Sequence, residues 1–180
     1  MGQLTVYAVE DQWSALLARG GEVDFFGTRL ALPAERKFAD LASVQRYVDA
    51  VLALPSIRER YPAAGSVEVR ERRGQAKAHY EPQTASIALP LGSARAAQSP
   101  SDSARAVNWA GRESVVLHEC AHHLACSLGP VDPSARERWH GVDFRAAMCA
   151  LVLAVLGDEA ALVLRAGYEA AGLPVVEAGA

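Results

Sequence analysis

The sequence predicts an α+β fold, because its hydrophobic pattern changes along the chain. Up to about residue 90, short stretches in which apolar and polar residues alternate, as in strands, are mixed with stretches that have the helical period. From about residue 111 onward the pattern is helical throughout. Strands with helices first and helices alone afterwards are typical of this class. With 180 residues the chain is long enough to bury one core, so we expect residues 1–180 to form a single domain.

The elements before residue 60 are predicted from alternation, helical periodicity and turn residues. Residues 4–8 predict a strand, and a helix should follow it and end at Gly20. Residues 23–32 predict a second strand. Asp40 is suited to cap the next helix, whose apolar residues recur with a period of 3.6 until Pro55 interrupts it.

Three short strands are expected next, followed by a loop. Val67 and Val69 alternate with charged residues, which indicates a half-exposed strand, and turns then lead into strands at 76–81 and 84–89. Strands joined in this way predict an antiparallel meander. Residues 92–105 are rich in Ser and Ala and contain few large apolar side chains, so we expect a mobile loop there.

The last third of the chain predicts three helices, at residues 111–127, 142–156 and 158–171. Gly129 should end the first of them, and Gly157 should separate the other two. The sequence contains no internal repeat.

Composition argues against several classes of partner and compartment. The net charge of −3 gives no electrostatic reason to expect nucleic acid or an anionic membrane as a partner. The longest apolar stretch, residues 146–156, is about half as long as a bilayer crossing requires. The N-terminus lacks the pattern of a signal peptide, and the three cysteines are an odd number without a CxxC pair, which favours a reducing compartment. We therefore expect a cytoplasmic protein.

The motif that carries chemistry lies at residues 115–124, which read Val-Val-Leu-His-Glu-Cys-Ala-His-His-Leu and contain HExxH. Positions four apart on a helix project from the same side, so His118 and His122 can bind one tetrahedral zinc ion. Glu119 can reach the open coordination position and activate a zinc-bound water. A chain of this length would contain the motif by chance about once in a hundred cases, and the uncharged residues around it indicate a helix packed in a core. We therefore predict one zinc ion per chain and Glu119 as the catalytic base.

A catalytic zinc ion usually takes a third protein ligand. The candidates downstream of the motif are Glu137, His140, Asp143, Glu159 and Glu169. We favour His140 because Gly141 allows a turn there and a helix follows, which would fix the position of the ligand. A glutamate or Asp143 stays open as the alternative.

The motif and its surroundings resemble known metalloproteases. HExxH followed by His-Gly-x-x-Phe is similar to the arrangement in the SprT-like and WLM-type metalloprotease families. Nearly the whole chain resembles a family of small bacterial metallohydrolases that is named for its motif. The stretches that carry this resemblance are 6–11, 25–30, 43–49, 73–80, 115–124 and 140–144.

The resemblance implies a minimal zincin-like fold, in which a small antiparallel or mixed sheet accompanies the HExxH helix and the C-terminal helices. It also implies a single zinc ion on His118, His122 and His140, with Glu119 as the base, but it implies no substrate. The family usually has proline after His-Gly, whereas this chain has Val142.

The remaining polar and aromatic residues near the motif are assigned mainly structural roles. His123 lies five positions from His118 and should point away from the metal into a hydrogen bond. Packing roles are expected for Cys120, Cys126, Cys149, Trp109 and Trp139. The residues that could donate a hydrogen bond to a developing oxyanion are Tyr80, Tyr168 and His79, and their spacing selects none of them.

The preferred function is metallopeptidase-like hydrolysis of an amide bond, with the substrate added to an exposed sheet edge. We expect the strand at 84–89 to be that edge. Two alternatives remain open: a non-peptidase metallohydrolase that acts on a small amide or ester, and a zinc-bearing regulatory or binding module without turnover. The intact Glu119 argues against the second alternative, because a purely structural site has no use for a carboxylate base.

Overall fold

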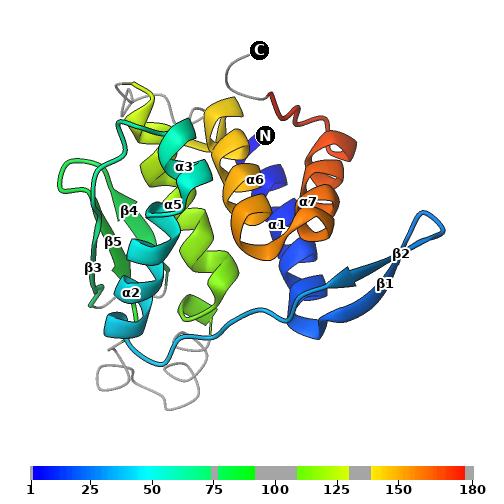
Figure 1. Ribbon diagram of the computed structural model, residues 1–180, viewed down its shortest axis with the longest axis horizontal. Coiled ribbons are helices and arrows are strands. Elements are labelled where there is room, and N and C mark those ends of the chain that lie inside the picture. Colours follow the sequence, from blue (N-terminus) through cyan, green and yellow to red (C-terminus); the bar gives the residue numbers. More distant parts are fainter. Residues whose placement is uncertain (1, 74–76, 92–108, 130–138, 177–180) are drawn as a thin grey trace.

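The computed structural model combines helices with two small sheets, which confirms the α+β class (Figure 1). It describes residues 2–73, 77–91, 109–129 and 139–176. The helices are α1 (Gly2–Arg19), α2 (Leu41–Leu52), α3 (Pro55–Arg60), α5 (Glu113–Ser127), α6 (Val142–Leu156) and α7 (Asp158–Ala170). The strands are β1 (Gly21–Phe25), β2 (Thr28–Leu32), β3 (Glu68–Glu71), β4 (His79–Glu81) and β5 (Ser86–Leu89). The loop predicted at 92–105 lies outside the described residues.

Helix α1 corrects the strand predicted at residues 4–8, because the helix begins at Gly2 and includes that segment. Five residues of alternating polarity are too few to distinguish a strand from one and a half helical turns. Over a longer stretch the helical period decides, since Val6, Val9, Trp13 and Leu17 form one buried face. The predicted end of this helix is confirmed, and Gly20 follows it with a φ of +60°.

The segment predicted as one strand at 23–32 is a hairpin of β1 and β2. The two residues between the strands, Phe26 and Gly27, both have positive φ (51° and 81°), as the tight turns of two-residue hairpins require. The hairpin extends from the body of the molecule beside α7, and Phe26 at its tip is 91% exposed (Figure 1).

The predicted antiparallel meander is wrong, since the three-stranded sheet has the order β3-β5-β4. Strand β5 pairs in parallel with β3 and antiparallel with β4, so β5 is the central strand. All four residues of β5 are buried, whereas β4 contains the exposed His79. The edge expected at 84–89 is therefore corrected: within the described residues, β3 and β4 are the edges.

Two glutamates fix the start of α5, the helix that carries the motif. Glu113 is fully buried and its carboxylate accepts hydrogen bonds from Arg36 Nη1 (2.6 Å), the Arg36 backbone N–H (2.9 Å) and Tyr47 Oη (2.7 Å). Glu35 accepts from Arg112 Nε (2.8 Å) and from the backbone N–H of Ser114 (3.0 Å). A carboxylate that binds free N–H groups at a helix N-terminus is stabilising. The orientation of α5 is therefore set by the segment just before α2.

Helix α5 is buried from its first residue through Leu124, and α6, α2 and β4 all contact it. Helices α1 and α7 complete the core beside α6 (Figure 1).

The predicted helices of the last third are confirmed to within two residues at each end. The predicted N-cap of α2 is also present, because Asp40 Oδ1 accepts a hydrogen bond from the Ser43 N–H at 2.7 Å. In the part of the chain that the structure describes, no helix combines the length and apolarity needed to cross a membrane.

Candidate metal centre

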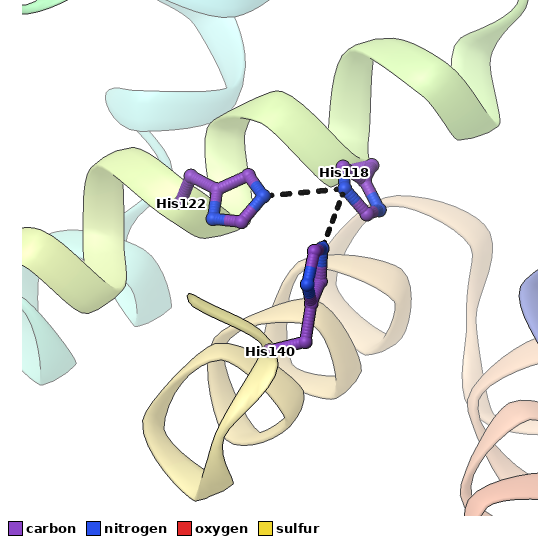
Figure 2. A group of neighbouring side chains, drawn as sticks. All are labelled: His118, His122 and His140. Atoms are coloured by element: carbon purple, nitrogen blue, oxygen red, sulfur yellow. Dashed lines mark hydrogen bonds between the residues drawn. The ribbon is translucent and has the colours of Figure 1, made fainter. Parts of the chain in front are cut away.

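Three histidine side chains converge between α5 and the start of α6 (Figure 2). His118 and His122 come from successive turns of α5, and His140 comes from the short turn that precedes α6. The Nε2 atom of His118 lies 3.2 Å from Nε2 of His122 and 3.2 Å from Nε2 of His140. All three side chains are buried.

This arrangement fits a tetrahedral metal ion. Nitrogen ligands at about 2.0–2.1 Å from a tetrahedral zinc ion are about 3.3 Å apart, close to the two distances observed. One ring nitrogen from each histidine lies within 4.8 Å of the corresponding nitrogen of the other two. Three buried imidazoles whose nitrogens face one another can therefore hold one metal ion, with a fourth position left for water or substrate.

Aromatic rings surround the histidines. The ring centre of Phe144 lies 4.5–4.8 Å from those of all three imidazoles. Trp139 packs against His122 at 5.4 Å, and Tyr7 stacks on His118 at 5.5 Å and meets His140 edge-on at 4.9 Å. Such a shell restricts the rotamers of the imidazoles and excludes water from their flanks.

Arg145 holds the main chain of His140 in place. Its Nη1 donates to the His140 carbonyl at 2.7 Å, while Nε and Nη2 donate to the Pro174 carbonyl at 3.1 and 2.9 Å. Gly141 has a φ of −70°, which any residue adopts. The conformation of His140 therefore depends on Arg145 and on the helix behind it, and the turn at 141 makes no use of the conformational freedom that glycine offers.

Glu10 on α1 orients His118. Its Oε2 lies 2.6 Å from Nδ1 of His118, and its Oε1 accepts a hydrogen bond from the hydroxyl of Tyr168 on α7. A carboxylate on Nδ1 fixes the tautomer in which Nε2 offers its lone pair to a metal. Burial acts to lower the pKa of His118, but the charge and hydrogen bond of Glu10 outweigh burial, and the net pKa is raised.

The other two histidines are held neutral. Burial, followed by the repulsion that a protonated His118 would exert, lowers the pKa of His140 to about 4. Burial, followed by the neighbouring histidines, lowers the pKa of His122 well below its ordinary value. A neutral imidazole is the form that binds a metal.

Glu119 lies beside the cluster and borders a cavity of about 580 Å³ together with His118. Burial raises the pKa of Glu119 to about 7, although the charge of His118 and a hydrogen bond from the backbone N–H of Tyr80 act in the opposite direction. That hydrogen bond places the base next to the outer edge of β4. A carboxylate with a pKa near neutrality is suited to take and return a proton.

The structure removes two candidates for an oxyanion donor. Tyr168 is fully buried and its hydroxyl donates to Glu10, while the buried Tyr80 hydroxyl lies 3.1 Å from Nδ1 of His123. His79 is exposed on β4. His123 points away from the cluster, as predicted, and its Nε2 donates to the Gly65 carbonyl at 2.9 Å.

Among the alternative ligands, Glu159 accepts from the Ala31 N–H at 2.7 Å, Glu169 pairs with Arg165 at 3.2 Å, and Asp143 is exposed. Glu137 lies outside the described residues. His140 is thus the candidate that the structure brings to the HExxH pair, and its role as a ligand stays a prediction.

Of the packing predictions, Cys120 is buried in the core, and Cys126, Cys149 and Trp139 pack against it. Trp109 differs, because it is 39% exposed and borders the cavity beside Glu119.

Sequence reasoning missed Glu10, Tyr168 as its partner, and Arg145. A signal for Glu10 exists: it is a lone carboxylate inside the apolar stripe of Val6, Val9 and Trp13. That stripe is visible only when the segment is treated as a helix, so the strand predicted at residues 4–8 concealed it.

Comparison of the chain with family models, with curated proteins and with solved structures finds no match. The resemblance to the small bacterial metallohydrolases and to the SprT-like and WLM-type families is therefore a prediction, and the function is argued from the geometry of the site.

Proposed function

We propose that this chain is a zinc-dependent hydrolase that cleaves an amide bond, most simply that of a peptide. The observation that carries the proposal is the convergence of three buried imidazole Nε2 atoms next to a buried carboxylate at the wall of a cavity. A site that only stabilises a fold needs no such carboxylate.

The donor set favours zinc among the divalent metals. Imidazole nitrogen is a borderline ligand that suits zinc, whereas magnesium and calcium prefer oxygen. Three nitrogen ligands and an open position are the usual composition of a catalytic zinc site. When bound, zinc would polarise a substrate carbonyl and lower the pKa of a water molecule.

Glu119 would carry the proton in the proposed reaction. Its carboxylate would accept a proton from the attacking water and then donate that proton to the leaving amine. The buried position of Glu119 suits both steps, because burial favours the protonated form that the group must hold between them. Glu10 would keep His118 in the correct tautomer throughout.

The edge strand β4 supports a peptide substrate. Its only partner among the described strands is β5, and the backbone N–H of Tyr80, in the middle of β4, donates a hydrogen bond to Glu119. An extended peptide can pair with such an edge and place one of its carbonyls over the site. A small amide is the second candidate substrate. One cavity borders β4 at Tyr80 and the other borders the residues just before it, Lys77 and Ala78. Two cavities along this segment favour the peptide, because a closed single pocket would suit a small molecule better.

The proposal is tested by loading the full chain with zinc and incubating it with a library of peptides derived from a proteome, beside Glu119→Gln. Glutamine has the same shape but cannot accept a proton, so the variant should keep its zinc and lose about 10²–10⁴-fold in rate. Glu59→Gln is the matched control, because Glu59 is an exposed carboxylate on α3. Near-normal cleavage by Glu119→Gln would contradict the assignment of the base, and zinc-loaded protein without cleavage of any peptide would favour the module without turnover.

A further inference from the structure

The cavity beside Glu119 has an apolar wall. Val115 of α5, Met148 of α6 and Trp13 of α1 line its interior, and Trp109 lines it with 39% of its surface exposed. Exposed aromatic side chains around a concave site are typical of a surface that buries an apolar ligand. The cavity therefore has the chemistry of a pocket for an apolar group.

The polar groups that face this cavity are either already engaged or at its margin. Glu10 is held by His118 and Tyr168, and its carboxylate is not free to bind a ligand charge. Asp11 and Lys77 are exposed and of opposite sign. The buried ionisable groups that line the cavity are Glu10, His118 and Glu119, and all three belong to the proposed metal centre. Among the described residues, none is left over to pair with a charged substrate side chain, which disfavours an ionic side chain as the occupant.

A second cavity of about 410 Å³ lies further along α5. It is bordered by His123 and Cys126, from the second half of α5, and by Trp139, which packs against His122. Ser114 and Val115 of the first cavity come from the beginning of α5. The first cavity therefore borders the beginning of α5 as far as Glu119, and the second borders the same helix from His123 onward.

The chain around β4 borders both cavities. Lys77 and Ala78, just before the strand, line the first cavity, whereas Tyr80, Pro82 and Gln83 line the second. A peptide that pairs with β4, parallel or antiparallel, lies alongside this segment. Its residues on the two sides of the scissile bond then face the two cavities.

We propose, on the basis of the function proposed above, that the cavity lined by Val115 and Trp109 is a specificity pocket. It receives one large apolar side chain, of the size of leucine or phenylalanine, from the substrate residue next to the scissile bond. The smaller cavity accommodates the chain on the opposite side of that bond. The enzyme is thereby selective for extended peptides with a large apolar residue at the position that faces Trp109.

Binding of small hydroxamates tests this without turnover, because a hydroxamate anchors on zinc and carries a variable side chain. Dissociation constants of the zinc-loaded full chain are measured by calorimetry for acetohydroxamate, isocaprohydroxamate, hydrocinnamohydroxamate and the acidic succinic monohydroxamate. We expect the two apolar compounds to bind at least about tenfold more tightly than the other two, since each buried methylene strengthens binding by about a factor of four.

Trp109→Ala should remove most of this gain, while Phe26→Ala, which replaces an exposed aromatic at the hairpin tip, should keep it. Equal affinity of the unmodified chain for all four compounds would contradict the proposed specificity pocket without contradicting the metal site. Because this comparison uses only the unmodified chain, it tests the pocket even if Trp109→Ala does not fold. If no hydroxamate binds although elemental analysis shows bound zinc, the proposed function itself fails.

Discussion

At the scale of single residues, the interaction that does most to prepare the site is the one between Glu10 and His118. The carboxylate fixes Nδ1 as the donor, and the hydroxyl of Tyr168 in turn fixes the carboxylate. Burial, followed by the charge and hydrogen bond of Glu10, raises the pKa of Tyr168 well above its ordinary value, so its hydroxyl stays a donor. Three helices, α1, α5 and α7, thus meet in one hydrogen-bonded chain that ends at His118, whose Nε2 faces the other two imidazoles.

Replacement of Glu10 is predicted to weaken metal binding. Glu10→Gln removes the charge that supports His118 and should lower zinc affinity by about 10–100-fold, as loss of an outer-shell partner usually does. Tyr168→Phe should have a smaller effect of the same sign, because it removes one hydrogen bond and leaves the carboxylate. Competition with a chromophoric chelator measures both, with Glu59→Gln as the control. Unchanged affinity in a folded Glu10→Gln variant would show that His118 needs no orienting partner.

At the scale of elements, the close approach of α1 and α7 brings these residues together. A Cβ atom on Gly167 would lie 2.9 Å from Val9 Cγ1, which is shorter than a van der Waals contact. The Val9 side chain cannot easily move away, because it is β-branched and buried. Val9 and Gly167 are the chain neighbours of Glu10 and Tyr168. The absence of a side chain at 167 therefore lets Tyr168 reach Glu10.

Gly167→Ala is predicted to destabilise the protein, although alanine normally stabilises a helix interior by about 0.5–1 kcal/mol relative to glycine. The steric conflict with Val9 should lower the free energy of unfolding by about 1–3 kcal/mol, as measured by urea denaturation. Val9→Ala provides the control, since it removes Cγ1. In the Val9→Ala background, Gly167→Ala should lower the free energy of unfolding by less than it does in the unmodified chain. If Gly167→Ala stabilises the protein equally in the unmodified chain and in Val9→Ala, the two helices do not touch at this point.

At the scale of the whole molecule, the candidate metal centre joins parts of the chain that are distant in sequence. His118 and His122 belong to α5, His140 precedes α6, and Glu10 comes from α1. A metal that binds the native arrangement and not the unfolded chain stabilises the fold by mass action. The same ion would thus support both the chemistry and the packing of the helical part.

Removal of zinc is predicted to lower the melting temperature. At a free zinc concentration one hundred times the dissociation constant, stabilisation should be about 2.7 kcal/mol, and elemental analysis should find about one zinc per chain. His140→Ala should bind more weakly and lose most of the zinc-dependent shift. A shift of the same size in His140→Ala would mean that His140 is not a ligand and that the third group must be sought elsewhere.

Elements whose signals are long and local could be predicted from the sequence alone. The helices α5, α6 and α7 were predicted to within two residues because each repeats the helical period over three or more turns between glycines. The Asp40 cap was predictable for the same reason, since it depends on a residue three positions away. The HExxH pair is also local, because the spacing of His118 and His122 alone places them on one face of a helix.

Most contacts between distant segments could be seen only in the tertiary structure, although His140 was expected near the HExxH pair from the sequence. The helical state of residues 4–8, the parallel pairing of β5 with β3 and the position of β4 at the sheet edge all depend on packing partners far along the chain. Glu10 reaches His118 across 108 positions, so no local pattern could assign its role. Periodicity and capping act over a few residues and are written in the sequence, whereas burial, charge and hydrogen bonds between elements act through space and exist only once the helices have packed.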